Sequence, residues 1–312
     1  MDAFLVTGGA GFIGSHLADA LLAAGARVRV LDDFSTGKRA NLDPRCELVV
    51  GDVADPAVLR AAMAGMAGCF HLAAIASVVR TNTDWRGTHR INQGGSIAVF
   101  EAARDPGRLP VVYASSAAVY GDLGGAAATE ATPCVPLTAY GADKLGTELH
   151  GRVAWQVHGV PTLGLRFFNV YGRRQDPASP YSGVVSIFAA RLGRGEGVTL
   201  HGDGGQTRDF VHVGDVVAHL IAAMRRLRGA PGAAVLNVCT GRATSVRDLA
   251  AILGGLLGAA PAIAHGPARP GDIARSLGDP ARAIATLGVA AAVRLERGLA
   301  DMLIDADGLT RS

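Results

Sequence analysis

Tyr140 and Lys144 stand four residues apart, in a stretch that predicts a helix over about Thr138–His158. Side chains at this spacing share one face of a helix. A free tyrosine has a pKa near ~10 and is a poor base at neutral pH. A nearby ammonium group, together with a positively charged cofactor ring, would favour the phenolate and lower that pKa. The pair could therefore take a proton from a hydroxyl group, and the alternative is an ordinary pair on a helix surface.

Ser116 follows an apolar run, Leu109–Ala114, that predicts a buried strand. Ligands of open α/β sheets bind beyond the carboxyl ends of the strands. Ser116 could therefore orient a reacting hydroxyl group toward Tyr140, or it could only cap the segment that follows. Asn92 lies on a helix predicted from about Asp84 to Arg104. It could bond near Tyr140 or a cofactor, or it could be a surface residue.

Three glycines at a spacing of three follow a predicted buried strand, Ala3–Val6, and the third lies in the first turn of a predicted helix, Phe12–Ala24. Such a turn needs the backbone freedom of glycine. A diphosphate can approach the bare backbone and sit at the helix N-terminus, where N–H groups favour anions. The context of strand, turn and helix indicates a dinucleotide site. Its residues are Gly8, Gly11, Phe12, Ile13 and Gly14.

Asp32 follows the next apolar run, Val28–Leu31. A carboxylate there can accept hydrogen bonds from an adenosine ribose and would repel a 2′-phosphate, which favours NAD over NADP. The alternative for Asp32 is a solvated turn carboxylate, which is how we interpret Asp33.

Further cofactor contacts are expected where two later strands end. Asp52 and Val53 follow a predicted strand over Glu47–Val50, and Asp52 could touch the adenine edge. It could instead cap the helix that follows Pro56. Small residues after a strand let a cofactor lie against the backbone. The stretch expected to do so, at the end of a strand over Gly68–Leu72, is Leu72, Ala73 and Ala74.

Strand and helix patterns alternate through the first half, which also contains a predicted strand over Leu163–Phe167. This alternation predicts an α/β fold of the Rossmann type, a doubly wound parallel sheet with helices on both faces. We expect residues 1–170 to form the dinucleotide-binding domain, with a returning segment of about 207–240. Residues 171–206 and 241–312 would form a smaller, interleaved substrate lobe across a cleft.

The second half is less regular. The sequence predicts helices over Val184–Leu192, Val211–Met224 and Ser245–Leu257, the last with Ser245 as its N-cap. It predicts a strand over Val235–Val238 that could return to the main sheet, and a polar loop over Gly172–Ser182.

Composition excludes several classes of protein. No apolar run is long enough for a membrane span, and no secretory signal is visible at the start. The net charge of +3 comes without a basic block, so no nucleic-acid partner is expected. The four cysteines form no C-x-x-C pair, which predicts reduced thiols in a cytoplasmic protein without a metal site.

These motifs together resemble the extended short-chain dehydrogenase/reductases, and in particular their UDP-glucose 4-epimerase group. The matching stretches cover essentially the whole chain in order: Thr7–Gly14, His71–Ala74, Ser115–Gly121, Tyr140–Lys144, Arg166–Gly172, Arg208–Asp215 and Arg269–Asp272.

The resemblance implies roles for matching positions. Tyr140 would be the base, Lys144 would tune it and hold the nicotinamide ribose, and Ser116 would shuttle the proton. The substrate would be a UDP-sugar. Its implied contacts are Asn169, the arginine pair Arg208 and Arg269, Asp272 at the uridine ribose, and Ser77 and Ser276 near the sugar. For each arginine the alternative is a solvated surface charge.

Two alanines distinguish this sequence from other enzyme classes of the family that it resembles. Ala117 and Ala118 follow Ser116 where the 4,6-dehydratases carry an Asp-Glu pair and the UDP-glucuronate decarboxylases carry a glutamate at the second position. Neither alanine can transfer a proton. The resemblance therefore implies a 4-epimerase, which oxidises C4, lets the keto sugar turn and returns the hydride to the other face. NAD would stay bound throughout.

The preferred sugar stays open between UDP-glucose or UDP-galactose, UDP-N-acetylglucosamine and UDP-glucuronate. Ser276 is small where some family members carry a bulky tyrosine, which suggests tolerance of a 2-acetamido group or another substituent. Val79 replaces a proline that is usual in its loop. The resemblance also implies a homodimer, formed through helices near Asp84–Arg104 and Thr138–His158. Two other classes are a sugar-nucleotide oxidoreductase and a non-catalytic NAD-binding regulator.

Overall fold

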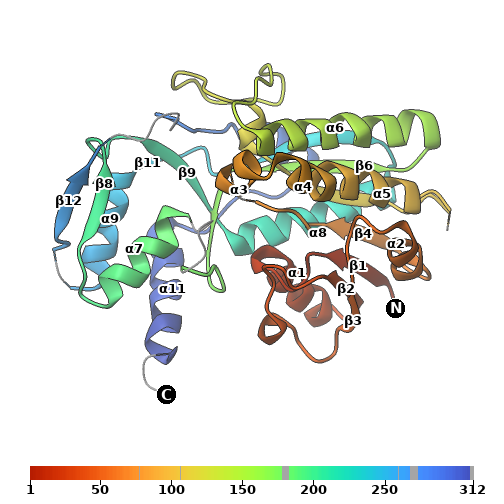
Figure 1. Ribbon diagram of the computed structural model, residues 1–312, viewed down its shortest axis with the longest axis horizontal. Coiled ribbons are helices and arrows are strands. Elements are labelled where there is room, and N and C mark those ends of the chain that lie inside the picture. The colour runs from red at the N-terminus through yellow and green to blue at the C-terminus, as the bar shows by residue number, and fades with distance from the viewer. Residues whose placement is uncertain (77, 106, 178–182, 259, 268–272, 310–312) are drawn as a thin grey trace.

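The computed structural model of the 312-residue chain describes residues 1–76, 78–105, 107–177, 183–258, 260–267 and 273–309. Figure 1 shows a larger lobe around one sheet and a smaller lobe beside it. Within the described ranges, none of the helices combines the length and the apolar character that a membrane crossing requires.

A parallel sheet forms the centre of the larger lobe (Figure 1). In the described part of the chain it has seven strands, in the order β3-β2-β1-β4-β5-β6-β10. All neighbouring pairs are parallel. The bounds are β1 Ala3–Thr7, β2 Arg27–Asp32, β3 Glu47–Val50, β4 Gly68–His71, β5 Val111–Ser116, β6 Thr162–Phe167 and β10 Ala233–Val238. The predicted doubly wound sheet and the returning strand are confirmed.

Helices cover both faces of this sheet. The helices on one face are α2 Pro56–Met63, α5 Gly95–Ala102 and α6 Ala139–His158; on the other they are α1 Phe12–Ala23 and α8 Val213–Gly229. Successive strand residues point to opposite faces. In β1, Phe4 and Val6 pack in the core that contains Leu17 of α1, whereas Leu5 packs in the core that contains Leu59 of α2. α10 (Ala281–Leu287) packs on α8 and β10.

The helix predicted over Asp84–Arg104 is divided into three parts. α4 (Trp85–His89) is followed by a π-helical turn over Arg90–Gly94 and then by α5. Asp84 caps α4 by accepting a hydrogen bond from the Gly87 N–H at 3.0 Å. A π turn inserts an extra residue and so rotates the following side chains. A further short helix, α3 (Val78–Thr83), was not predicted.

Over the residues that the structure describes, the smaller lobe contains two small sheets and their helices. The sheets are β11-β9-β7 and β12-β8, with β7 Asn169–Tyr171, β8 Val198–His201, β9 Thr207–His212, β11 Ala243–Ser245 and β12 Ile263–Gly266. The helices are α7 Val184–Gly193, α9 Val246–Leu256 and α11 Leu295–Leu309. Ser245 caps α9 as predicted, since its hydroxyl accepts from the Asp248 N–H.

The helix predicted over Val211–Met224 is wrong at its start. Val211 and His212 belong to β9, which pairs with β7 and β11, and α8 begins at Val213. The His212 ring caps α8 by accepting from the Gly214 N–H.

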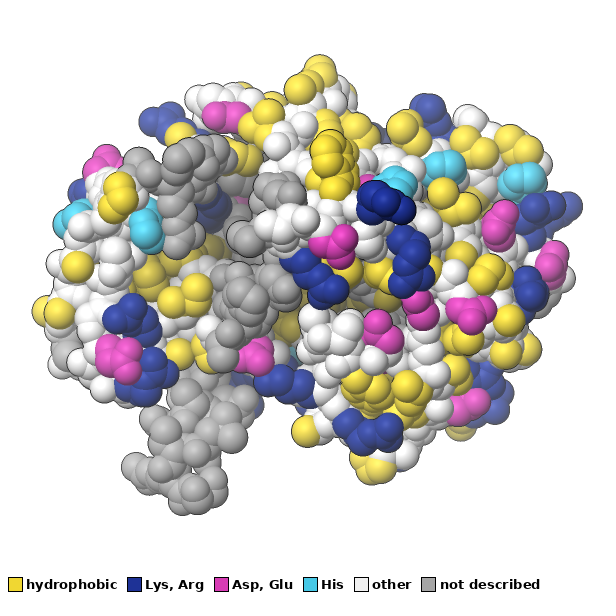
Figure 2. Space-filling view, viewed as in Figure 1, with side chains coloured by type: hydrophobic (Ala, Val, Ile, Leu, Met, Phe, Trp, Pro, Cys, Tyr) yellow, Lys and Arg dark blue, Asp and Glu magenta, His cyan; other side chains and the backbone are white. Residues whose placement is uncertain are grey.

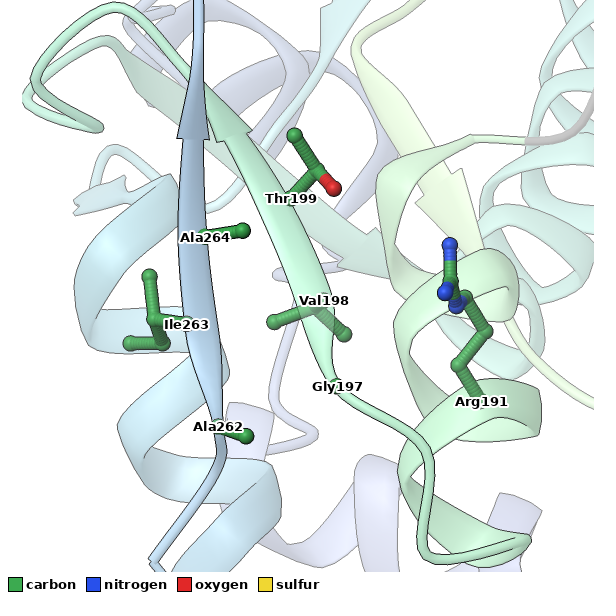
Figure 3. Close-up of a pocket in the computed structure, with 7 residues that line it drawn as sticks. All are labelled: Arg191, Gly197, Val198, Thr199, Ala262, Ile263 and Ala264. Atoms are coloured by element: carbon green, nitrogen blue, oxygen red, sulfur yellow. The ribbon is translucent and has the colours of Figure 1, made fainter.

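One pocket of about 280 Å³ lies beside the two-stranded sheet (Figure 3). Figure 3 shows Arg191 extending from α7 alongside β8. The other lining residues are Gly197, Val198, Thr199, Ala262, Ile263 and Ala264. No residue predicted to do chemistry lines this pocket, so the candidate site lies elsewhere.

Candidate active site

The predicted dinucleotide turn lies at the carboxyl ends of β1 and its neighbours. From β1 the chain passes through α1 to β2 on one side, and β4 lies on the other side of β1. Such a point, where the order of strands reverses, is where ligands of open α/β sheets bind. The stretch Leu72–Ala74 leaves β4 at the same edge, so the structure brings the two predicted cofactor segments together.

The glycine turn is too tightly packed for side chains. Gly8 has a φ of +68°, and a Cβ atom there would lie 2.7 Å from the Ala73 nitrogen. A Cβ atom at Gly14 would collide with the Gly8 carbonyl oxygen, so strand and helix pack closely there. Among the described residues, no side chain caps α1. The N–H groups of its first turn are therefore open to an anion, and the turn fits a dinucleotide diphosphate.

Asp32 ends β2 and holds the glycine turn in place. Its carboxylate accepts hydrogen bonds from the Ala10 and Phe34 N–H groups, both at 2.9 Å. Burial raises the pKa of Asp32, and the two backbone hydrogen bonds oppose that rise. Each oxygen keeps further acceptor capacity. The reading of Asp32 as a solvated turn carboxylate is wrong, whereas Asp33 does bond locally, to the Ser35 N–H and hydroxyl.

Asp52 does not cap the helix after Pro56. Its carboxylate accepts from the Ala54 N–H and forms an ion pair with Arg90 at 2.7 Å. The N-cap of α2 is Asp55, which accepts from the first N–H groups of that helix. Val53, the neighbouring predicted contact, is buried.

Asn92 is fully buried, so the alternative of a surface residue is wrong. Its side chain bonds both backbone groups of Ile75, accepting from N–H at 2.7 Å and donating to C=O at 3.2 Å. It thereby braces the segment that leaves β4. The structure gives no bond from Asn92 to Tyr140 among the described contacts.

A chain of buried hydrogen bonds, which joins β1, β4 and α5, also holds the end of β4 in place. The Thr7 hydroxyl lies 2.8 Å from Nδ1 of His71, and the His71 Nε2 atom lies 3.0 Å from the Ser96 hydroxyl. Ser96 donates onward to the Asn92 carbonyl, so it accepts from His71, whose Nε2 atom carries the proton. Burial lowers the pKa of His71 to about 3 and keeps it neutral.

Tyr140 meets Ser116 at the start of α6. Thr138 caps α6 by accepting from the Gly141 N–H at 3.1 Å. A Cβ atom at Gly141 would lie 2.5 Å from the Ala118 carbonyl oxygen, so glycine lets the helix approach the end of β5 closely. The Ser116 hydroxyl accepts from the Ala118 N–H, which is the capping role considered as an alternative. Ser116 also lowers the pKa of Tyr140, against the stronger effect of burial.

Lys144 is buried, so the Tyr140–Lys144 pair is not an ordinary surface pair. The ammonium group donates to the Ala114 carbonyl at 2.9 Å and lies 5.7 Å from the centre of the Tyr140 ring. Burial lowers the pKa of Lys144 to about 8. Burial also raises the pKa of Tyr140 to about 12. In the protein alone, desolvation outweighs the opposing effect of Ser116 on Tyr140. The lowering expected from the ammonium group together with a positive nicotinamide ring stays a prediction for the loaded enzyme.

Comparison with known proteins agrees with this arrangement. The model of the NAD dependent epimerase/dehydratase family matches residues 4–239. The chain belongs to this family. A UDP-glucose 4-epimerase of Mycolicibacterium smegmatis is 38% identical over 306 residues, which cover 95% of this chain and 96% of that protein.

Two solved structures have the same fold over nearly the whole chain. UDP-glucose 4-epimerase from Thermotoga maritima with UDP-glucose has a TM-score of 0.94 at 33% identity, and covers 99% of this chain and 100% of its own. UDP-N-acetylglucosamine 4-epimerase from Methanobrevibacter ruminantium, in complex with UDP-N-acetylmuramic acid, has a TM-score of 0.93 at 30% identity and covers 99% of both chains. The protein is thus an NAD-dependent enzyme of the UDP-sugar 4-epimerase type.

The predicted substrate residues are only partly described. Asn169 in β7 lies on the strand next to β9, which carries Arg208. Arg208 donates to the Thr207 and Ile273 carbonyls, and the Ser276 N–H donates to the same Thr207 carbonyl. The start of β9 therefore brings together the segments that carry Arg208 and Ser276. Three predicted residues lie outside the described ranges: Ser77, Arg269 and Asp272.

Sequence reasoning missed two buried charges on α6. Asp143 is buried, and its carboxylate pairs with His89 of α4 at 2.7 Å. Glu148 is buried one turn after Lys144 and pairs with Arg166 of β6 at 2.6 Å. The spacing of Glu148, four residues after Lys144, was visible in the sequence. Its partner was not, because β6 lies beyond the end of the helix.

Proposed function

We propose that the protein interconverts the C4 epimers of a UDP-hexose of the UDP-glucose and UDP-galactose type. The observation that carries this proposal is the convergence of Tyr140, Lys144 and Ser116 at the end of β5. The two residues that follow Ser116 are alanines, which form a short 3-10 turn. They offer no acid for eliminating water, so the chemistry stays at C4.

In this proposal Tyr140 takes the proton of the C4 hydroxyl group, and Ser116 holds that hydroxyl toward Tyr140. When bound, NAD supplies the hydride acceptor and donor for C4, together with a positive ring in its oxidised form. Positive charge near a phenol favours the phenolate. The pKa of Tyr140, about 12 in the protein alone, therefore has to fall in the loaded enzyme before Tyr140 can act as a base near neutral pH.

The cofactor is proposed to lie along the edge formed by β1, β2 and β4, in the domain of residues 1–170. The glycine turn would hold the diphosphate, and Asp32 the adenosine ribose. The proposed contacts are Gly8, Gly11, Phe12, Ile13, Gly14, Asp32, Asp52, Val53, Leu72, Ala73, Ala74, Asn92, Tyr140 and Lys144. In the structure described above, Asn92 and His71 brace this edge from within the protein.

The sugar nucleotide is proposed to contact the lobe of residues 171–206 and 241–312, with Asn169 and Arg208 at its border. The proposed contacts are Ser77, Ser116, Tyr140, Asn169, Arg208, Arg269, Asp272 and Ser276. A second candidate substrate is UDP-N-acetylglucosamine. The small side chain of Ser276 favours it, as does the similarity to the Methanobrevibacter enzyme. UDP-glucuronate is a further alternative.

A homodimer is proposed through α6 and α4. Three apolar residues four apart on α6 are exposed to 49%, 43% and 67%: Leu149, Val153 and Val157. Trp85 on the neighbouring α4 is also exposed. In Figure 2, hydrophobic side chains lie beside histidines over α6. An apolar stripe on one helix face indicates a packing partner, and a second copy would complete a four-helix bundle.

The proposed dimer can be tested by placing one charged side chain in the interface. Val153→Glu should give a monomer by light scattering, because a charge would enter the apolar interface. Ile284→Glu is the matched control, since Ile284 is 41% exposed on α10 and far from this stripe. A dimer that persists in Val153→Glu would place the interface elsewhere.

The function is tested by NMR on the purified protein with UDP-glucose, UDP-N-acetylglucosamine and UDP-glucuronate, without added cofactor. The anomeric signals report C4 inversion, and absorbance reports NADH. A galacto-configured product without net NADH is the expected result and would name the substrate. Product that requires a stoichiometric change in NADH would favour an oxidoreductase, and no product from any of the three would reject the proposed substrate class.

A further inference from the structure

The end of β5 is tied to α6 through consecutive residues. The Ala114 carbonyl accepts a hydrogen bond from the Lys144 ammonium group at 2.9 Å. The Ser115 hydroxyl donates to the Glu148 carboxylate at 2.5 Å. Ser116, the next residue, lies close enough to Tyr140 to lower the pKa of its hydroxyl group.

The three partners on α6 form one stripe. Tyr140, Lys144 and Glu148 are spaced four residues apart, so their side chains lie above one another on the same helix face. Two members of the stripe carry the proposed chemistry. Glu148 is the third member, and it lies too far along the helix to reach a substrate held at Ser116.

Glu148 is held rigidly by Arg166. The guanidinium group donates from Nε and Nη2 to the two carboxylate oxygens at 2.8 and 2.6 Å. Such a bidentate pair fixes orientation as well as distance. Arg166 also donates to the Tyr120 hydroxyl at 2.8 Å, and Tyr120 donates to Asn237 of β10 at 2.6 Å. The carboxylate is thereby anchored to the two strands beyond β5.

The buried ion pair of Glu148 and Arg166 is not explained by stability alone. Both side chains are buried, and the desolvation of two charges commonly cancels their attraction, so that a hydrophobic replacement is often as stable. What the pair supplies is a fixed point on α6 from which the Ser115 hydroxyl can be held.

We infer that Glu148 is a positioning residue that sets the register between α6 and the end of β5, and with it the approach of Ser116 to Tyr140. The inference rests on the proposed function, because it assigns Glu148 to the geometry of that site. It predicts that loosening the tie between Ser115 and Glu148 slows the chemical step without weakening substrate binding.

The charge of Glu148 also acts on Lys144. It raises the pKa of Lys144 against the stronger effect of burial, together with Asp143. The titratable and charged groups around the stripe come from four elements and one turn: Asp143 of α6, His71 of β4, Tyr113 of β5, Arg166 of β6 and Tyr120 after the 3-10 turn. Glu148→Gln removes one negative charge from this set and leaves Arg166 unpaired. Both changes favour the neutral form of Lys144.

Three variants test the inference. Ser115→Ala keeps every charge, and it should lower kcat about tenfold with KM and the pH profile unchanged. Glu148→Gln should lower kcat at least as much and move the alkaline limb of the profile down by roughly one pH unit. Thr162→Val is the control, because Thr162 ties β6 to α6 through the Gly151 carbonyl at 2.7 Å and, among the described contacts, bonds no member of the stripe. It should leave kcat and the profile unchanged.

The outcomes separate this inference from the proposed function. The sequence contains two lysines, Lys38 and Lys144, so NMR of protein with ¹³C-labelled lysine reads the titration of Lys144 without any turnover, with Lys38 as an exposed reference. A Lys144 pKa unchanged in Glu148→Gln, or full kcat in Ser115→Ala, overturns the inference. If Glu148→Gln does not fold, Ser115→Ala decides alone. If the wild type inverts no sugar, the proposed function fails and the lysine titration still decides whether Glu148 acts on Lys144.

Discussion

Replacing Gly8 with alanine would push the glycine turn away from the segment after β4, and both segments belong to the proposed cofactor site. Gly8 has a φ of +68°, which costs a residue with a Cβ atom about 1–2 kcal/mol. The new Cβ atom would also lie 2.7 Å from the Ala73 nitrogen and 2.8 Å from its Cα atom. Backbone atoms cannot swing away as a side chain can, and overpacking of this kind costs about 1–3 kcal/mol. The free energy of unfolding should fall by about 2–5 kcal/mol.

Gly25→Ala is the matched control. Gly25 has a φ of +81°, but among the described residues no heavy atom lies within 4 Å of the position of its Cβ atom. The free energy of unfolding of Gly25→Ala should fall only by the backbone cost of about 1–2 kcal/mol, and its NAD affinity should not change. Denaturant unfolding of both variants and calorimetric titration with NAD measure the two effects. Equal stabilities, or unchanged NAD affinity in Gly8→Ala, would refute the close contact between the glycine turn and the segment after β4 as the basis of the site.

Three further predictions concern single side chains. Tyr140→Phe should lower kcat about 10²–10⁴-fold while calorimetry finds NAD and UDP-sugar binding intact; full activity would reject Tyr140 as the base. Ser276→Tyr should lower kcat/KM for UDP-N-acetylglucosamine more than for UDP-glucose in the NMR assay, and equal losses would dismiss Ser276 as a size filter. Because the pKa of His71 is about 3 in the folded protein, against 6.5 for an ordinary histidine, the unfolded chain binds an extra proton between those values. Stability should therefore fall as pH drops from 6.5 toward 3, and the Tm of His71→Asn should fall less over that range; identical slopes in both proteins would contradict a neutral, buried His71.

Local patterns in the sequence were sufficient to predict the main sheet and most of the helices that cover it. The apolar runs and amphipathic stretches of the first half predicted strands and helices because burial on one or both faces imposes a period. The N-cap Ser245 could be predicted because a cap residue bonds an N–H group three residues further along the helix. Patterns failed at the end of β9, where the sequence assigned two strand residues to a helix. β9 was absorbed into the following helix, because its partners β7 and β11 lie elsewhere in the chain.

The candidate site divides in the same way. The types and spacing of Tyr140 and Lys144, and the glycines before α1, could be found from the sequence alone, because each motif acts within one or two turns of backbone. Which site residues are buried, and which groups they bond, could not be predicted from the sequence. From the sequence, Asn92 could be either a cofactor contact or a surface residue. The structure places it in the π turn, buried and bonded to Ile75.

What the sequence by itself determined is the chemistry available and the order of strands and helices that carries it. The tertiary structure alone decided which charges are buried and what they face. It joins Thr7 to His71 across 64 residues and Glu148 to Arg166 across 18. It also raises the pKa of Tyr140 in the protein alone, because burial outweighs the opposing effect of Ser116. The physical reason is that desolvation depends on every atom packed around a group, and a local pattern contains only the nearest few residues.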